Sequence, residues 1–128
     1  MTPSSPYKST GGLIRIIRAL RYSLQGLGAA WRHEAAFRQE TILAVILIPL
    51  GLWLGNTAGE RLLLSGMLVG VLIVELINSA IEALADAIST DQHPLLGRAK
   101  DIGSAAVLLM LLLTGAAWAS VLIPRWIF

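Results

Sequence analysis

Cysteine is absent from this chain, and charged residues are scarce. Without cysteine, disulfides, iron–sulfur clusters and thiolate zinc sites are excluded. Charged side chains make up 14 % of the 128 residues, whereas about 25 % is usual in soluble domains. The net charge of +2 argues against a dedicated nucleic-acid binder, so no nucleic-acid partner is expected. Since 55 % of the residues are hydrophobic, we expect lipid to surround much of the protein.

Two further absences concern phosphoryl transfer and export. The sequence has no G-x-x-x-x-G-K-[ST] segment and no glycine-rich kinase loop, which excludes the soluble phosphoryl-transfer folds. It also lacks an apolar segment with a small-residue cleavage site near its start, so we expect no cleavable signal peptide. Residues 1–12 are rich in Ser, Thr, Pro and Gly and are predicted to be a disordered tail. Residues 13–128 are predicted to form a single domain.

Residues 13–31 have the periodicity of an amphipathic helix. Arginines and other polar residues share one side, and the apolar residues share a stripe about 100° wide. The apolar positions are Leu13, Ile16, Ile17, Leu20, Leu24, Leu27 and Trp31. A basic helix of this kind is suited to an anionic membrane surface. We prefer that interpretation to a core-facing helix because the chain has little other soluble mass to pack against.

Three longer apolar segments follow this helix. Each can cross a hydrocarbon layer of about 30 Å as a helix that rises about 1.5 Å per residue. They are predicted to span the membrane over residues 35–54, 62–88 and 102–123. A turn over residues 54–60 is expected to join the first two spans, and a polar loop over residues 89–100 the last two. The sequence therefore predicts an all-α membrane protein with a surface helix and three transmembrane helices.

The basic residues predict how these helices are oriented. Most of them fall on one side of the membrane when the spans alternate in direction. That side carries Lys8, Arg15, Arg18, Arg21, Arg32, Arg38, Arg98 and Lys100, and the other side carries Arg61 and Arg125. By the positive-inside rule, the N-terminus and residues 89–100 are expected in the cytoplasm, with the C-terminus facing outward.

A stripe of polar residues lies on the second span. Relative to Glu75, Asn78, Glu82 and Asp86 sit at about −60°, −20° and +20° around a helix, so they form one ridge. Glu75 is predicted to lie about 20 Å into the span, with Glu82 near the inner hydrocarbon boundary and Asp86 beyond it. An ionisable group within the bilayer costs at least ~2.5 kcal/mol and usually faces a cavity or a partner. We interpret the ridge as the functional site, although Asp86 alone also fits the wet end of a helix.

Carboxylates at this depth suit more than one function. One is general-base catalysis on a lipid hydroxyl, with boundary carboxylates holding a divalent metal and nucleotide phosphates. The alternatives are an ion or proton pathway and a structural adaptor without chemistry. Glu34, Lys100 and Asp101 are expected at the membrane level of Glu82, where they could contact phosphate and metal or simply anchor the chain. Three helices bury little polar surface, so a homo-oligomer is a reasonable hypothesis.

Three blocks of this sequence resemble those of the prokaryotic diacylglycerol kinase family. They are Glu75-Leu-Ile-Asn78-Ser79-Ala-Ile-Glu82-Ala-Leu-Ala-Asp86, Glu34-Ala-Ala-Phe37-Arg38-Gln39-Glu40 and Gly97-Arg98-Ala99-Lys100-Asp101-Ile-Gly103-Ser104-Ala-Ala. With Arg15, Tyr22 and Ser23 in the first helix, the resemblance covers nearly everything after Gly12. The block over residues 34–40 is more similar to the Gram-negative branch, which uses diacylglycerol, than to the Gram-positive branch, which phosphorylates undecaprenol.

The resemblance implies a homotrimeric enzyme of the inner membrane that phosphorylates diacylglycerol with ATP and Mg²⁺, giving phosphatidic acid. Its active sites would be built between subunits at the cytoplasmic surface, and its C-terminus would be periplasmic. Glu75 would be the general base, Glu34 and Glu82 the metal ligands, and Asn78 and Asp86 supporting residues. The nucleotide would contact Arg15, Tyr22, Glu34, Glu82, Asp91, Gln92, His93, Lys100 and Asp101. The lipid would contact Arg15, Ser23, Gln39, Trp53, Glu75 and Ser104.

Overall fold

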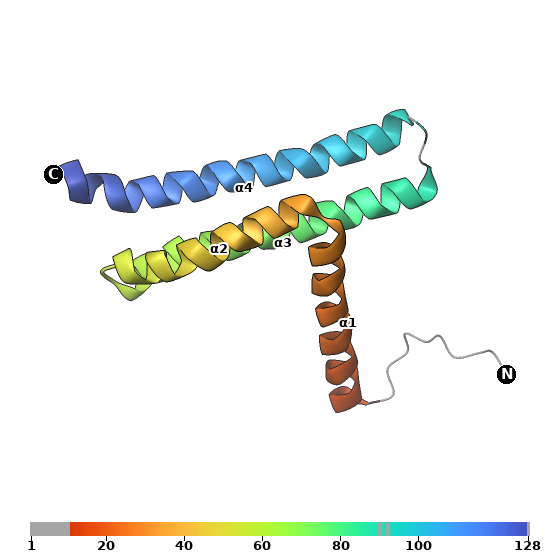
Figure 1. Cartoon of the computed structure of the whole chain (residues 1–128), viewed down its shortest axis with the longest axis horizontal. Coiled ribbons are helices and arrows are strands. Elements are labelled where there is room, and N and C mark those ends of the chain that lie inside the picture. The colour runs from red at the N-terminus through yellow and green to blue at the C-terminus, as the bar shows by residue number, and fades with distance from the viewer. Residues whose placement is uncertain (1–10, 90, 92, 128) are drawn as a thin grey trace.

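The computed structural model describes residues 11–89, 91 and 93–127, and these form four α-helices without a strand. The helices are α1 (Gly12–His33), α2 (Ala35–Leu54), α3 (Ala58–Ile88) and α4 (Pro94–Ile127). In Figure 1, α2, α3 and α4 run along a common direction and α1 projects across it. α3 is the central helix, because it packs against both α2 and α4.

The three aligned helices are each long and apolar enough to cross a membrane, which confirms the expected all-α architecture with three candidate spans. α2 has the predicted bounds. α3 and α4 contain 31 and 34 residues, so they are roughly 46 and 51 Å long at about 1.5 Å per residue. Both exceed a hydrocarbon layer of about 30 Å, so helices of this length that cross one would extend beyond it at their ends.

The connections are shorter than the sequence suggested. The segment 94–100, expected to lie in a polar loop, forms the first turns of α4. Proline suits the first position of a helix, and Nδ1 of His93 accepts the backbone N–H of Leu95 at 3.2 Å. α3 likewise begins before the expected span, because the hydroxyl of Thr57 caps it by accepting the N–H of Glu60 at 3.1 Å.

At the other end of the chain, the tail expected over residues 1–12 falls largely outside the described residues. Its last residue, Gly12, is already the first residue of α1.

Small residues and two side-chain hydrogen bonds bring α3 and α4 together. Trp118 Nε1 donates to the carbonyl of Leu64 at 3.0 Å, and Thr114 Oγ1 is 3.4 Å from the carbonyl of Met67. Gly103 lies so close to Asn78 that a Cβ at residue 103 would overlap the amide oxygen. At this point the backbone of α4 therefore packs against a side chain of α3, with no room for an added methyl group.

Glycine also permits α2 to approach the pair formed by α3 and α4. A Cβ at Gly51 would lie 3.0 Å from Cβ of Leu64 and 3.3 Å from the ring of Trp118. Such contacts are typical of helices that pack through small residues in membranes.

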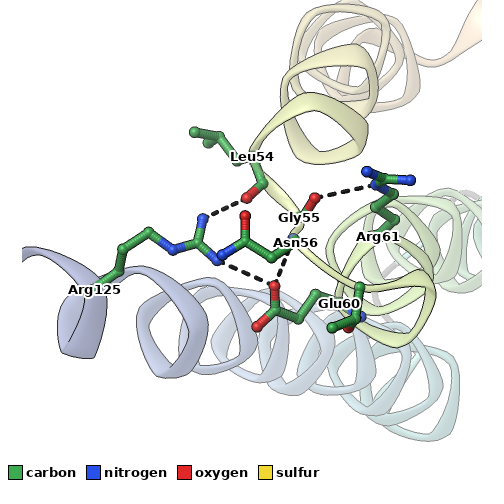
Figure 2. A network of polar contacts seen from close by, with 7 residues as sticks. Leu54, Gly55, Asn56, Glu60, Arg61 and Arg125 are labelled. Carbon is green, nitrogen blue, oxygen red and sulfur yellow. Dashed lines mark hydrogen bonds and ion pairs between the residues drawn. The ribbon is translucent and has the colours of Figure 1, made fainter.

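A polar network joins the α2–α3 turn to the end of α4 (Figure 2). The guanidinium of Arg125 donates to the carbonyl of Leu54 and lies 3.1 Å from Oε2 of Glu60. The same carboxylate oxygen accepts the N–H of Asn56 at 2.7 Å. Arg61 donates to the carbonyl of Gly55 at 3.1 Å. All three long helices are thus tied at one end by charge-assisted hydrogen bonds.

Much of the apolar surface of the long helices stays exposed in a single chain. Large aliphatic side chains such as Val45, Ile77 and Leu109 are more than half exposed. Exposed apolar area on this scale is expected where helices face lipid or further protein.

Candidate functional site

The candidate site begins at the elbow between α1 and α2. Glu34 is the only residue between the two helices, and its φ of −116° and ψ of 105° interrupt the helical path. Its backbone N–H still donates to the carbonyl of Ala30 at 2.9 Å. One extended residue is therefore enough to send α1 across the direction of the long helices and to leave Glu34 half-buried at the corner.

A groove of about 640 Å³ runs from this corner between α1 and α3. Most of its lining side chains are small or apolar, and the polar ones are two serines, a histidine and a glutamate. They are Ser23, Gly26, Leu27, Ala29, Ala30, His33, Glu34, Leu76, Ser79, Ala80 and Ala83. The groove is therefore apolar along its length with a carboxylate at its corner, a character that suits an amphiphilic ligand.

Glu75 is the most deeply buried carboxylate, with 4 % of its surface exposed. It lies on the inner face of α3, and Ser79 Oγ is 3.4 Å from its Oε1. Three more carboxylates lie near enough for electrostatic interaction with Glu75: Glu40 of α2, Glu34 at the elbow, and Glu82 two turns further along α3. We name these four residues, Glu34, Glu40, Glu75 and Glu82, the carboxylate cluster.

No Lys, Arg or His among the described residues lies within ion-pair distance of the carboxylate cluster. The two ion pairs among the described residues instead join Lys100 to Asp86 and Arg125 to Glu60. Like charges held together in a poorly solvated place repel one another, unless a cation or a proton compensates them. The cluster is therefore suited to bind a cation or to accept a proton.

Three polar atoms, one in the cluster and two on residues next to its members, are buried without a hydrogen-bond partner in the described chain. They are Oδ1 of Asn78, Oε2 of Glu40 and Oγ1 of Thr41. A buried polar group left unpaired costs about 1–3 kcal/mol, so such groups commonly mark a place where a ligand, water or another chain supplies the missing partner.

A second, more polar region lies where α3 ends and α4 begins. Lys100 Nζ and Asp86 Oδ1 are 2.5 Å apart and form an ion pair between the two helices. Next to Lys100 is a groove of about 440 Å³, which also contains Ser89, Asp91, His93 and Gly97. The structure thus brings together Asp86, Asp91, His93 and Lys100, which the sequence had placed in the site.

Other predicted residues are not gathered in one pocket. Trp53 is 79 % exposed near the opposite end of α2, and fourteen residues separate it from Gln39, or roughly 21 Å along a helix. Only a long extended ligand could contact both.

Several of the remaining predicted residues are solvent- or lipid-accessible rather than enclosed. Arg15 and Tyr22 lie on exposed parts of α1, and Asp101 and Ser104 are exposed on α4. Gln92 lies outside the described residues.

The predicted metal ligands do not form a complete site in one chain. Among the described residues, no group of three or more acidic or histidine side chains is close enough to hold a metal ion. A metal held by Glu34 and Glu82 would need its further ligands from phosphate, water or another copy of the chain.

Sequence reasoning did not assign a role to Glu40 or Ser79. Glu40 could have been found in the same way as Glu75, because it is likewise a carboxylate inside an apolar helix. Ser79 could have been found by its spacing, since residues four apart lie on the same face of a helix.

Comparison with known proteins shows which family the chain is similar to. The model of the prokaryotic diacylglycerol kinase family matches residues 21–122. The diacylglycerol kinase of Pseudomonas aeruginosa is 49 % identical over 123 residues, which cover 96 % of this chain and 99 % of that protein. The diacylglycerol kinases of Haemophilus influenzae and Escherichia coli K12 are 47 % and 46 % identical, over 91 % and 89 % of this chain and 98 % and 93 % of their own lengths.

A match of this extent, on a chain whose helices and carboxylate cluster fit a membrane enzyme, shows that this protein is an enzyme that belongs to the prokaryotic diacylglycerol kinase family.

Proposed function

We propose that the protein transfers the γ-phosphoryl group of ATP to the free hydroxyl of diacylglycerol, giving phosphatidic acid and ADP. The observation that carries the proposal is the burial of Glu75 on an apolar helix among further carboxylates without a basic partner in the described chain. Family membership supplies the reaction class, and the apolar groove that ends at Glu34 supports an amphiphilic substrate.

In this mechanism Glu75 accepts the proton of the lipid hydroxyl as its oxygen attacks phosphorus. Ser79 lies beside one carboxylate oxygen, Oε1, which leaves the other oxygen for the substrate. Asn78, one turn along α3 from Glu75, is buried with its amide oxygen against Gly103 of α4, and it would support the site by holding α3 and α4 in place. Positioned bases contribute about 10²- to 10⁴-fold to such reactions, while phosphoryl transfer depends chiefly on positioning and charge neutralisation.

Two residues of the carboxylate cluster could contribute to a divalent cation site whose other ligands come from outside the chain. Mg²⁺ is usually bound by one or two carboxylates together with phosphate oxygens and water. Glu34 and Glu82 would supply such a pair, and neither has a basic partner within the described residues. When bound with ATP, Mg²⁺ would neutralise phosphate charge. Arg15, Tyr22, Asp91, His93, Lys100 and Asp101 would contact the nucleotide, as would Gln92 outside the described residues.

We place the site at the cytoplasmic face of the inner membrane, with the N-terminus inside and the C-terminus in the periplasm. The distribution of basic residues supports this orientation. The direction of α1, which lies across the long helices in Figure 1, supports its placement on the membrane surface. Ser23, Gln39, Trp53 and Ser104 would then contact the lipid along the outside of the helices.

We further propose that the working form is a homotrimer with composite sites. A single chain leaves extensive apolar surface exposed and brings together an incomplete set of metal ligands. A neighbouring chain would cover part of that surface and complete the site with groups of its own.

The test is lipid phosphorylation by the purified protein in detergent micelles. Radiolabelled ATP is supplied with Mg²⁺ and with diacylglycerol, undecaprenol or no lipid. Labelled phosphatidic acid in the first reaction is expected. If undecaprenyl phosphate is the only labelled product, the substrate is undecaprenol and not diacylglycerol. The absence of labelled lipid with both acceptors would refute the proposal.

A further inference from the structure

A single side chain holds the elbow between α1 and α2. The last carbonyl groups of a helix have no partner within that helix. At the end of α1, the carbonyls of Trp31 and Arg32 both accept from Nη1 of Arg38, at 2.8 and 3.1 Å. Arg38 belongs to the first turn of α2. The guanidinium therefore closes the corner by bonding the end of one helix to the start of the next.

Few other contacts fix the direction of α1. Ala30 is its only buried residue, and a groove separates part of the helix from α3. Helices in folded proteins are held chiefly by packing of an apolar face. Since that packing is slight here, the direction of α1 depends strongly on the bonds at the elbow.

Arginine is well suited to this position. A cation near the C-terminal end of a helix interacts favourably with the helix dipole. The guanidinium also presents several donors in a fixed plane, whereas the lysine ammonium is a point charge on a flexible stem. Arg38 therefore fixes both the distance and the angle at the corner, and lysine would preserve only part of this function.

We propose that Arg38 is a positioning residue, which fixes α1 relative to α2 and thereby holds Glu34 in the carboxylate cluster. Glu34 is the residue at the corner itself, so any change in the angle of α1 moves its backbone. The proposal rests on the proposed function, in which Glu34 holds the cation that accompanies ATP. It assigns to Arg38 a role exerted through Glu34 and α1, without contact to the reacting atoms.

Steady-state kinetics provide the first test. Arg38→Gln is expected to raise the KM for MgATP on the order of tenfold, as loss of charge-assisted hydrogen bonds would, with a smaller change in the KM for diacylglycerol. Arg38→Lys should restore part of the affinity. The matched control is Arg32→Gln, which removes an equal charge nearby. The Arg32 side chain donates to Gly28 within α1 and not across the elbow, so its kinetic constants should stay within about twofold.

A distance measurement provides the second test and does not depend on activity. The chain has no native cysteine, so spin labels can be attached at Leu20→Cys in α1 and Ile46→Cys in α2, both at exposed positions. Labelled protein is diluted with unlabelled protein, so that pairs within one chain dominate the pulsed dipolar signal. We expect a narrow distance distribution, which Arg38→Gln broadens and Arg32→Gln leaves unchanged.

An unchanged distance distribution in Arg38→Gln would overturn the proposal, because any kinetic loss would then come from direct contact with substrate. A broader distribution with an unchanged KM for MgATP would also overturn it, because the elbow would not control the site. Failure of the proposed function would show differently, as absence of phosphatidic acid from the unsubstituted protein.

Discussion

The close approach of Gly103 to Asn78 makes substitution of this glycine a sensitive test of the packing around the site. An alanine Cβ at residue 103 would overlap the amide oxygen of Asn78, whose neighbour on the same helix face is Glu75. α4 would have to move away from α3, or Asn78 would have to leave its position. Either response disturbs the part of the bundle in which the buried carboxylate lies.

The magnitude follows from two opposing effects. Forcing an extra methyl group into a tightly packed place costs about 1–3 kcal/mol. Replacing glycine by alanine within a helix returns about 1 kcal/mol. Gly103→Ala should therefore lower the free energy of unfolding by up to about 2 kcal/mol.

Gly115→Ala is the matched control, since a Cβ at Gly115 in the same helix would meet no atom within 4 Å. Only the helix-propensity effect applies there, so this variant should gain up to about 1 kcal/mol. The difference between the two variants then measures the steric effect directly.

The assay is equilibrium unfolding in mixed micelles, followed by circular dichroism as sodium dodecyl sulfate is added. A double-mutant cycle with Asn78→Ala identifies the side chain responsible. Removing the amide should relieve the overlap, so that Gly103→Ala then gains up to about 1 kcal/mol, as Gly115→Ala does. Equal stability changes for Gly103→Ala and Gly115→Ala would refute the reasoning, and so would a steric loss that persists in the Asn78→Ala background.

Two further predictions concern the opposite end of the bundle and the nucleotide. Arg125→Gln should lower the unfolding midpoint more than Glu60→Gln does, because it removes the donor to the Leu54 carbonyl as well as the ion pair. Equal midpoints for the two variants would contradict the network in Figure 2. Glu82→Gln removes one of the two proposed metal ligands, so it should weaken Mg²⁺-dependent ATP binding and lower turnover. Calorimetry measures the binding, and unchanged binding would exclude Glu82 as a ligand.

Much of the fold could be predicted because hydropathy and length determine which segments can cross a membrane. The bounds of α2 were predicted correctly, since the segment begins just after Glu34 and ends just before Gly55. The extensions of α3 and α4 beyond the apolar segments were missed, because polar residues can also be helical and a hydropathy pattern does not detect such helices. The start of α4 at Pro94 and the cap at Thr57 follow from local hydrogen bonds, which residue-type signals at Pro94 and Thr57 could have indicated.

The candidate site was harder to predict than the spans. Helical periodicity placed Glu75 and Asn78 on one ridge with Glu82 and Asp86, and in the structure the first two are buried while Asp86 pairs with Lys100 on α4. Periodicity describes one helix, and it cannot show which neighbour covers each side. The proximity of Glu40 to Glu75 and the bond from Arg38 across the elbow depend on how separate helices meet, so they required the three-dimensional structure.

The central claim is that Glu75 accepts the proton of the lipid hydroxyl, and Glu75→Gln tests it most directly. Glutamine keeps the shape of the buried side chain but has little ability to accept a proton. The measurement is kcat for phosphatidic acid formation, with MgATP affinity determined on the same preparation. The account predicts a fall in kcat of about 10²-fold or more with affinity within about threefold of that of the unsubstituted protein. A kcat close to that of the unsubstituted protein would contradict it.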